Sequence, residues 1–185
     1  MNSSLSLQAF DPATDEEALV EFLSSQTWPY HGNPNPSAES VREGLASGRY
    51  TDEEQRTFWI VEGEGASAAK LGLVRVFDLG DPTPMFDVRL GEQSRGRGIG
   101  ETAVRLLAEY VFTRFEDKPR LEGHTRADNY AMRKTFVKAG FVKEAYHRKA
   151  WPTGGTLYDS VGYAITREDW SAGKVTPIDW NDFPY

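Results

Sequence analysis

Hydrophobic residues along the chain fall into short alternating runs and longer helical patterns, which predict a succession of strands and helices. Residues 5–9 alternate Leu and Ala with Ser and Gln and predict a first strand. Residues 15–25 carry apolar residues at helical spacing, and Thr14 is the predicted N-cap. A second helix is expected to begin at an N-cap, Ser37, and to stop at Gly48.

Three more strands are predicted before residue 91. Residues 57–61 (TFWIV) and residues 71–79 (LGLVRVFDL) are mostly apolar and predict two strands, and the small residues between them predict a hairpin. Pro82 and Pro84 then break the chain ahead of an alternating run at residues 85–90.

The second half of the chain continues as helix, strand and helix. An amphipathic helix is predicted from residue 99, followed by a strand at residues 120–125. A further helix is expected between an N-cap at Asn129 and a stop at Gly140. Because a strand at residues 85–90 precedes the first of these helices, the order predicts a parallel strand pair joined by a right-handed crossover.

Two last strands, at residues 141–151 and 157–165, are expected to form a hairpin. Residues 1–170 therefore form one predicted domain. The aromatic tail, residues 171–185, is expected to pack on this domain or on the partner in a homodimer.

Composition narrows the class of protein. With 185 residues, 39% of them hydrophobic, the chain can bury the core of a single domain. It has no cysteine, which excludes disulfides and thiolate catalysis and permits a reducing compartment. A net charge of −7 argues against sequence-independent nucleic-acid binding. No apolar run approaches the length of a membrane span and no leader pattern is evident, so we expect a soluble, cytoplasmic protein that does not contact membranes.

A glycine loop lies between the predicted strand at residues 85–90 and the long helix. Residues 93–100 read QSRGRGIG, so three glycines precede or open the helix. Glycine lets backbone N–H groups approach a ligand closely, and a helix start adds unpaired N–H groups and a positive dipole. Arg95 and Arg97 add positive charge. The loop is predicted to bind a pyrophosphate.

The residues after the last glycine decide among phosphate ligands. A P-loop requires Lys and Ser or Thr there, but Glu101 and Thr102 follow Gly100. A dinucleotide fingerprint opens the first βαβ unit, whereas four predicted strands precede this loop. Coenzyme A fits a glycine loop this late in a mixed sheet better than a nucleoside triphosphate or a dinucleotide does.

The ordered set Arg95-x-x-Gly98-x-Gly100, then Asn129, then residues 138–141 (KAGF) resembles the GCN5-related N-acetyltransferase (GNAT) superfamily. The runs at residues 140–144 (GFVKE) and 159–170 (DSVGYAITREDW) are similar to the RimJ/RimL-like branch. The resemblance implies a single α/β domain with a mixed sheet of six to seven strands and about four helices. It also implies transfer of an acetyl group from acetyl-CoA to a primary amine, which is a protein N-terminus or a small molecule.

The resemblance further assigns the acetyl-CoA site. The diphosphate would lie on the loop. The pantetheine arm would run beside the end of the strand at residues 85–90 and contact Asn129 at the start of the next helix. The alternative role for Asn129 is an ordinary helix N-cap, and the two roles can coexist. The cofactor-binding residues implied in this way are Leu90, Gly91, Arg95, Gly96, Arg97, Gly98, Ile99, Gly100, Asn129, Met132 and Arg133.

An unusual charge pattern suggests the acceptor side. Central strands covered by helices are normally apolar, yet Asp87 and Arg89 alternate with apolar residues, as do Glu122 and His124 on a neighbouring strand. One interpretation is an inert buried ion pair. The other is a cleft in which Glu122 or Asp87 orients the amine and His124 or water accepts its proton, and Glu122, then Asp87, then His124 are the catalytic candidates in that order.

Several residues leave alternatives open. Many relatives place a tyrosine seven residues after the helix asparagine to protonate the leaving thiolate, and here that position is Phe136. The aromatic loop with Trp28, Tyr30 and His31 either covers a core edge or, together with Arg89, binds the acceptor. No spacing of His, Asp or Glu suggests a metal. A non-catalytic acyl-CoA-binding or sensing module is the alternative function.

Overall fold

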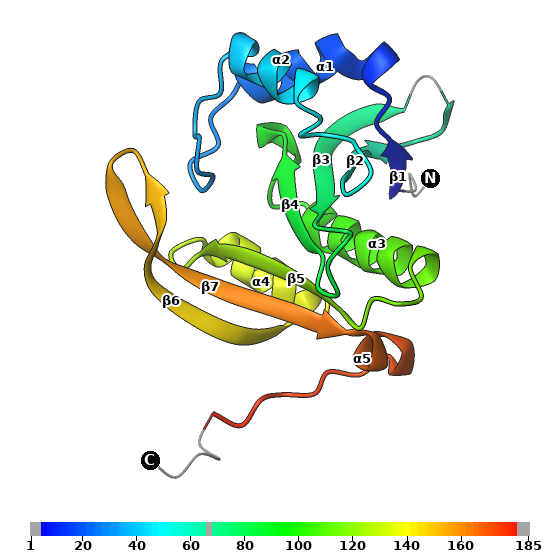
Figure 1. Cartoon of the computed structure of the whole chain (residues 1–185), viewed down its shortest axis with the longest axis vertical. Coiled ribbons are helices and arrows are strands. Elements are labelled where there is room, and N and C mark those ends of the chain that lie inside the picture. The colour runs from blue at the N-terminus through cyan, green and yellow to red at the C-terminus, as the bar shows by residue number, and fades with distance from the viewer. Residues whose placement is uncertain (1–4, 66–67, 181–185) are drawn as a thin grey trace.

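The computed structural model describes residues 5–65 and 68–180, and its centre is one mixed sheet in the order β1-β2-β3-β4-β5-β7-β6 (Figure 1). All neighbouring strands run antiparallel except β4 and β5, which are parallel as predicted. The strands are β1 (Leu5–Ala9), β2 (Arg56–Glu62), β3 (Ala69–Phe77), β4 (Met85–Leu90), β5 (Arg120–Arg126), β6 (Val142–Thr153) and β7 (Thr156–Thr166). The fold-class prediction is confirmed.

Five α-helices and one short 3-10 helix flank the sheet within the described residues, one α-helix more than expected. The helices are α1 (Pro12–Ser24), α2 (Ala38–Ala46), η2 (Glu92–Ser94), α3 (Ile99–Arg114), α4 (Tyr130–Lys138) and α5 (Arg167–Ala172). The unexpected helix is α5, whose six residues follow β7 directly and are capped by Thr166 through the amide of Asp169.

Helix α1 begins earlier than predicted. Asp11, not Thr14, is the N-cap, since its carboxylate accepts the amide N–H of Ala13 at 2.9 Å. Pro12 occupies the first helical position, where its missing N–H costs nothing. The Asp-Pro pair therefore starts the helix as well as ending the strand. The second predicted cap is confirmed, because Ser37 accepts the amide of Ser40.

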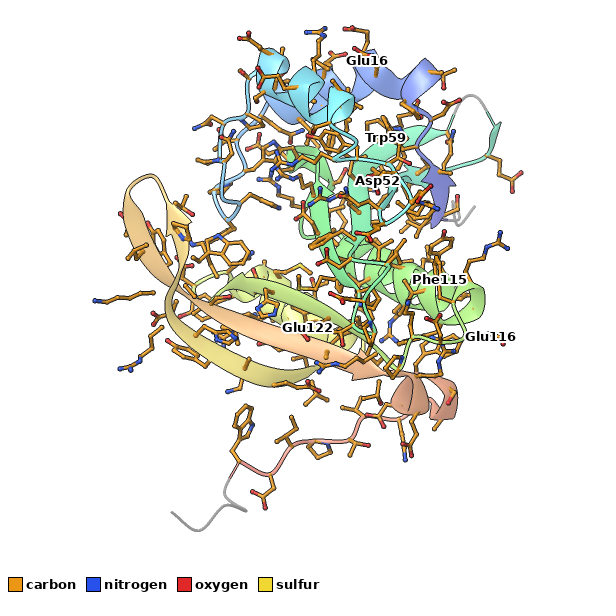
Figure 2. All side chains as sticks on the ribbon, in the orientation of Figure 1. Glu16, Asp52, Trp59, Phe115, Glu116 and Glu122 are labelled. Carbon is orange, nitrogen blue, oxygen red and sulfur yellow. The ribbon has the colours of Figure 1, made fainter. Side chains whose placement is uncertain are left out.

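Two hydrophobic cores lie on the sheet. The larger packs α3 and α4 against the central strands, with Val74, Leu107 and Leu121 fully buried. The smaller lies under α1 and α2, where Trp59 fills the space between the helices and the sheet (Figure 2). Successive residues of β2 belong alternately to the two cores, so the cores lie on opposite faces of the sheet.

The parallel strands β4 and β5 separate soon after they meet. Their register contains one pair within the described residues, Met85 with Glu122, supported by the amide of Glu122 donating to Pro84 at 3.0 Å. Beyond that pair, β4 stays with β3 and β5 stays with β7. The edges that face each other therefore have backbone groups without a neighbouring strand.

The described part of the C-terminal tail runs past β6, away from the helices (Figure 1). Thr176 donates to Asp169 through both its amide and its hydroxyl, and the Lys143 ammonium lies 5.4 Å from the Trp180 ring. Trp180 remains 55% exposed. Packing of the whole tail on the domain or on a partner stays a prediction, because residues 181–185 lie outside the described part.

Candidate active site

The glycine loop presents unpaired amides at the start of α3. Gly96 and Gly98 have φ of 75° and 81°, a left-handed conformation that a side chain would strain. Gly98 is the N-cap of α3 without a capping side chain. Within the described residues, the amides of Gly96, Gly98 and Gly100 have no hydrogen-bond partner. Such a group of free N–H donors at a helix start suits an anion.

A cavity of about 370 Å³, the loop cavity, opens in front of these amides. It extends from the loop along the end of β4 to α4 and is walled by the aromatic loop. The predicted cofactor residues that line it are Leu90, Arg95, Gly96, Gly98, Ile99, Gly100, Asn129 and Met132. These residues, far apart in sequence, come together as the resemblance implied.

Three other predicted cofactor residues do not line the loop cavity. Gly91 donates its amide to Leu71 at 2.9 Å. Arg97 points to Glu62, with 3.5 Å between the charged atoms. Arg133 donates to the backbone oxygen of Ala127 at 2.8 Å, which turns its side chain toward β7.

Residues on one face of α4 were missed by the sequence analysis. Ala131, Lys134, Thr135 and Lys138 line the loop cavity at helical spacing. The signal was available, since these positions share a face once Asn129 and the helix are accepted. Both lysines add positive charge next to the glycine loop.

Asn129 has the two roles considered from sequence. Its Oδ1 accepts the amide of Met132 at 3.2 Å, which is the N-cap bond. Its Nδ2 donates to Thr125 Oγ1 at 3.0 Å and so ties α4 to β5. The same residue lines the loop cavity.

Two histidines, each bound to a carboxylate, meet where the loop cavity ends. His31 Nε2 lies 3.0 Å from Asp87 Oδ1, and His124 Nε2 lies 2.5 Å from Glu122 Oε1. Both histidines line a small cavity of about 50 Å³ next to Asn129, here called the junction cavity. Because an ionised carboxylate only accepts, Nε2 carries a proton in each pair, and in the neutral form of the imidazole Nδ1 is left as the acceptor.

The two pairs differ in the surroundings of Nδ1. In His31 this atom is buried without a partner in the described part of the chain, whereas His124 Nδ1 is not among the buried unpaired atoms. Burial alone would raise the pKa of Asp87, but the charges of His31, Arg89 and Arg75 hold that pKa well below its usual value. Asp87 is therefore ionised at neutral pH.

Glu122 contacts His124 but lines none of the cavities around the site. Its second oxygen lies 2.9 Å from Arg120, which also binds Glu144 at 2.6 Å. Figure 2 labels Glu122 on β5, next to the β6–β7 hairpin. The first catalytic candidate thus contacts the third, His124.

A larger cleft of about 480 Å³, the hairpin cleft, continues from the junction cavity toward β6 and β7. His31, His124 and Asp87 line both spaces, together with Phe86 and Trp151. His147 also reaches this cleft and stacks on His124, with 5.8 Å between ring centroids. The junction cavity shares both histidines with the hairpin cleft and shares His31 with the loop cavity, so it lies between the two.

The aromatic loop covers a core edge and also walls the site. Trp28 is 2% exposed and donates its indole N–H to Leu23 at 2.8 Å. Tyr30 packs against Arg126 and lines both the loop cavity and the junction cavity. The two interpretations of this loop therefore hold together.

The position of the family tyrosine holds a buried Phe136, which stacks on Tyr163 with 4.7 Å between centroids. The Tyr163 hydroxyl accepts from Arg133. Tyr146 donates to Asp159, and Tyr130 is 67% exposed on α4. None of these three tyrosines lines the loop or junction cavity, so none replaces the missing hydroxyl.

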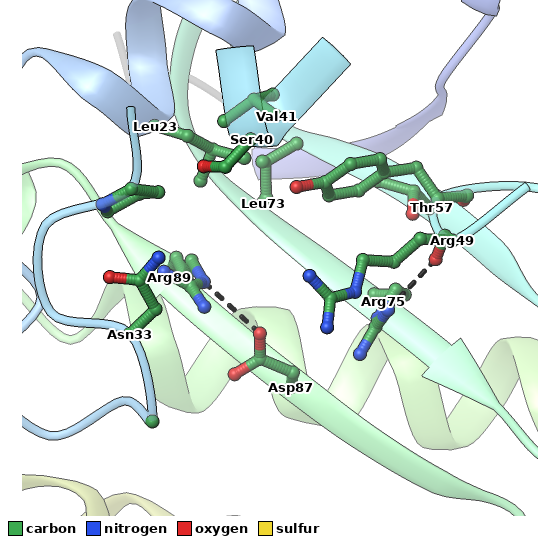
Figure 3. A pocket seen from close by; sticks show the side chains of 13 residues that line it. Leu23, Asn33, Ser40, Val41, Arg49, Thr57, Leu73, Arg75, Asp87 and Arg89 are labelled. Carbon is green, nitrogen blue, oxygen red and sulfur yellow. Dashed lines mark hydrogen bonds and ion pairs between the residues drawn. The ribbon is translucent and has the colours of Figure 1, made fainter. Parts of the chain in front are cut away.

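A further cavity beside the aromatic loop contains two arginines that the sequence analysis did not single out. Arg49 and Arg75 line it together with the predicted Arg89, and Asp87 lies at its floor (Figure 3). The available signal was Arg75, a lone charge inside the apolar run at residues 71–79. We call this space of about 230 Å³ the arginine cavity.

Metal-binding clusters and membrane-spanning helices are both absent from the described residues. No three His, Asp or Glu side chains gather there as a metal site. Across the same residues, no helix combines the length and the apolar character needed to cross a membrane.

Comparison with known proteins identifies the family. The model of the acetyltransferase (GNAT) domain matches residues 4–142, three quarters of the chain. The chain belongs to the GNAT acetyltransferases. Comparison with curated protein sequences finds no significant match.

Solved GNAT structures confirm the fold. Spermidine N-acetyltransferase from Vibrio cholerae, solved with CoA and spermine, is 18% identical over 90% of this chain and 98% of its own, with a TM-score of 0.74. A chimera of that enzyme, SpeG, with hSSAT is 19% identical over 91% of this chain and 99% of its own, with a TM-score of 0.76. A dodecameric form of the Vibrio enzyme is 19% identical over 90% of this chain and 95% of its own, with a TM-score of 0.71.

Family membership makes this GNAT protein an acetyl-CoA-dependent N-acetyltransferase, as the sequence predicted. The structure fits that donor, because the free amides of the glycine loop, the lysines of α4 and the end of β4 border the loop cavity, and β5 lines the adjoining junction cavity. The anionic part of the donor suits the amides and lysines. An extended arm suits the unpaired strand edges.

Proposed function

We propose that the protein acetylates a primary amine by direct attack, with His124 as the general base. The observation that carries this proposal is the pair of carboxylate-bound histidines at the junction cavity, between the loop cavity and the hairpin cleft. When bound, acetyl-CoA supplies the thioester that the amine attacks. The chain has no cysteine, so a cysteine-linked acyl intermediate has no nucleophile here.

The hydrogen bonds of the two ring nitrogens favour His124 over His31 as the general base. An amine must lose a proton to attack, and a neutral imidazole Nδ1 is a suitable acceptor. Glu122 holds His124 through Nε2, which keeps the acceptor nitrogen of His124 free. In His31 that nitrogen is enclosed, so His31 is better suited to fix Asp87 than to take a proton. In this proposal Glu122 is a positioning residue.

Asp87 is proposed to attract the amine. Its carboxylate lines the junction cavity, the hairpin cleft and the arginine cavity, and it stays ionised at neutral pH. An ammonium group entering the hairpin cleft would therefore meet a negative charge next to His124 before it loses its proton.

We also propose membership of the RimJ/RimL-like branch, for which the runs at residues 140–144 and 159–170 are the support. Peptide N-termini are the acceptors that this branch suggests, and polyamines are those that the names of the structural neighbours suggest. A cysteine-free chain suits the cytoplasm, where we place the enzyme. Assembly into homo-oligomers is proposed by analogy with the dodecameric neighbour.

A thiol-release assay tests the proposal. Purified protein is mixed with acetyl-CoA and a panel of polyamines, amino acids, phosphorylated amines and short peptides, and free CoA is measured over time. Release that depends on an amine supports the proposal. Tight binding of acetyl-CoA without release for any acceptor would favour a non-catalytic acyl-CoA sensor instead.

A further inference from the structure

We propose that the acceptor amine also carries an oxyanion, a carboxylate or a phosphate, and that Arg49, Arg75 and Arg89 bind this group in the arginine cavity. The inference rests on the proposed N-acetylation, since it names the chemical class of its acceptor. It concerns residues outside the glycine loop and outside the two histidine–carboxylate pairs.

The three guanidinium groups converge on one space. Arg49 and Arg75 approach from the side of β2 and β3, Arg89 comes from β4, and all three turn toward the cavity above Asp87 (Figure 3). The opposite wall is apolar and comes from Leu23 on α1 and from a neighbouring residue of α2. A basic cavity with an apolar wall is partly screened from water, which strengthens the attraction for an anion.

The positive charge of the arginine cavity is only partly balanced. Asp87 is the carboxylate among its lining residues, and it already pairs with Arg89 at 3.2 Å and with His31 at 3.0 Å. Within the described residues, Arg49 and Arg75 form no ion pair with a carboxylate. Arg75 instead donates to two neutral oxygens, the backbone oxygen of Arg49 at 2.8 Å and the amide of Gln55 at 3.3 Å.

The charges around Arg75 act on its pKa in a consistent way. Burial lowers the pKa of Arg75, the charge of Asp87 offsets part of that effect, and the positive charges of Arg49 and Arg89 lower the pKa further. Burial also raises the pKa of Tyr50, whose ring lines the same cavity. An oxyanion would pair with guanidinium groups that at present face one another.

The arginine cavity opens on the place where the amine must react. Gly32, Arg75, Asp87 and Arg89 line both the arginine cavity and the hairpin cleft. A small molecule can therefore place its anion on the arginines while its ammonium group meets Asp87 beside the two histidines. Opposite charges at the two ends of the site match a zwitterion, such as an amino acid or a phosphorylated amine.

The same charges disfavour a polyamine. A chain that carries only ammonium groups would bring positive charge to three arginines with a single shared carboxylate, and like charges repel. The neighbouring Vibrio cholerae enzyme was solved with spermine. Shared fold thus does not predict a shared acceptor.

The test compares acceptors that differ only in the anion. The wild-type protein is assayed by thiol release with β-alanine against β-alanine amide, with phosphoethanolamine against ethanolamine, and with spermidine. We expect at least one anionic acceptor to exceed its neutral partner in kcat/KM by roughly 10- to 100-fold, the worth of a hydrogen-bonded charge pair. The two pairs distinguish a carboxylate from a phosphate.

Three variants separate binding from folding. Arg49→Met and Arg75→Met should each lower kcat/KM for the preferred anionic acceptor by about tenfold or more, and should lower it less for the neutral partner, so that the anion preference shrinks. Arg49 is the more informative, because its side chain is exposed and its loss should not disturb the core. Arg42→Met is the matched control, since Arg42 pairs with Glu17 on the outer side of the same helix layer and does not line the cavity.

The outcomes are distinct. Equal or better turnover of ethanolamine, β-alanine amide or spermidine would overturn this inference and leave the N-acetyltransferase proposal standing. An unchanged anion preference in both Arg49→Met and Arg75→Met would also overturn it. Absence of thiol release with every amine would refute the proposed function, and this inference would fall with it.

Discussion

Replacing Glu122 by Gln removes the charge that orients His124 while keeping the size of the side chain. In the wild type, His124 Nε2 donates to Glu122 Oε1 at 2.5 Å, which fixes the tautomer with a free Nδ1. A glutamine can offer either its oxygen or its NH₂ group to that nitrogen. The imidazole of Glu122→Gln therefore populates the tautomer in which Nδ1 carries a proton and cannot act as the base.

The geometry sets the size of the effect. A hydrogen bond to a charged group contributes about 1.5–3 kcal/mol, and each 1.4 kcal/mol corresponds to roughly tenfold in rate, so kcat should fall about 10- to 100-fold. Neither side chain is more than 27% exposed, so solvent does not screen the pair strongly. Affinity for acetyl-CoA should stay unchanged, because Glu122 does not line the loop cavity.

The assay is steady-state thiol release with a competent acceptor, together with an equilibrium binding measurement for acetyl-CoA. Glu144→Gln is the matched control, since Glu144 binds the same Arg120 at 2.6 Å but does not touch His124. That variant should keep the wild-type kcat. A Glu122→Gln enzyme within twofold of wild type, or an equal loss in Glu144→Gln, would refute the role given to the Glu122–His124 pair.

Three further outcomes follow from local geometry. Gly98→Trp should abolish acetyl-CoA binding, because the new side chain fills the anion site. Gly98 has φ of 81°, so a side chain there is also strained by roughly 1–2 kcal/mol. Retained binding with a native circular dichroism spectrum would contradict the loop assignment. Gly123→Ala should lower the free energy of unfolding by about 1–3 kcal/mol in urea melts, since its Cβ would lie 2.7 Å from the Phe136 ring, while Gly32→Ala, with open space, should not. The pKa of Asp87 is held below its usual value, so its contribution to stability is present above about pH 4 and lost as the pH falls further. The gap in Tm between wild type and Asp87→Asn should therefore narrow below about pH 4, and a constant gap would contradict this.

The donor side of the site could be predicted from sequence because it depends on short-range patterns. The spacing of Gly96, Gly98 and Gly100 and the cap at Asn129 each lie within one turn of a helix start. Local chemistry of this kind is visible in a single sequence. Hydrophobic periodicity likewise located all seven strands, since every one of them contributes to a buried core or pairs with a strand that does.

What sequence could not predict depended on contacts between distant segments. His31 and Asp87 are 56 residues apart, and only the packing of the aromatic loop against β4 brings them to 3.0 Å. Arg49 and Arg75 meet through a backbone oxygen in the same way. Helix α1 is a different case, because Asp11 and Pro12 are local start signals that were interpreted as the end of a strand.

The donor and the acceptor meet different kinds of group in this site, and this difference determines which substitutions can change the specificity of the protein. In the proposed site, donor binding would rest largely on backbone N–H groups, which most substitutions leave in place provided that the glycine conformations are kept. Acceptor binding rests on side chains from β3, β4 and the preceding loops, so one substitution alters the charge that an incoming amine meets. A GNAT protein can therefore keep its fold and donor at 18% identity to a spermidine acetyltransferase while three arginines direct it to an acceptor of opposite character. Changing the acceptor preference of this enzyme should then require substitutions at Arg49 and Arg75, not in the glycine loop.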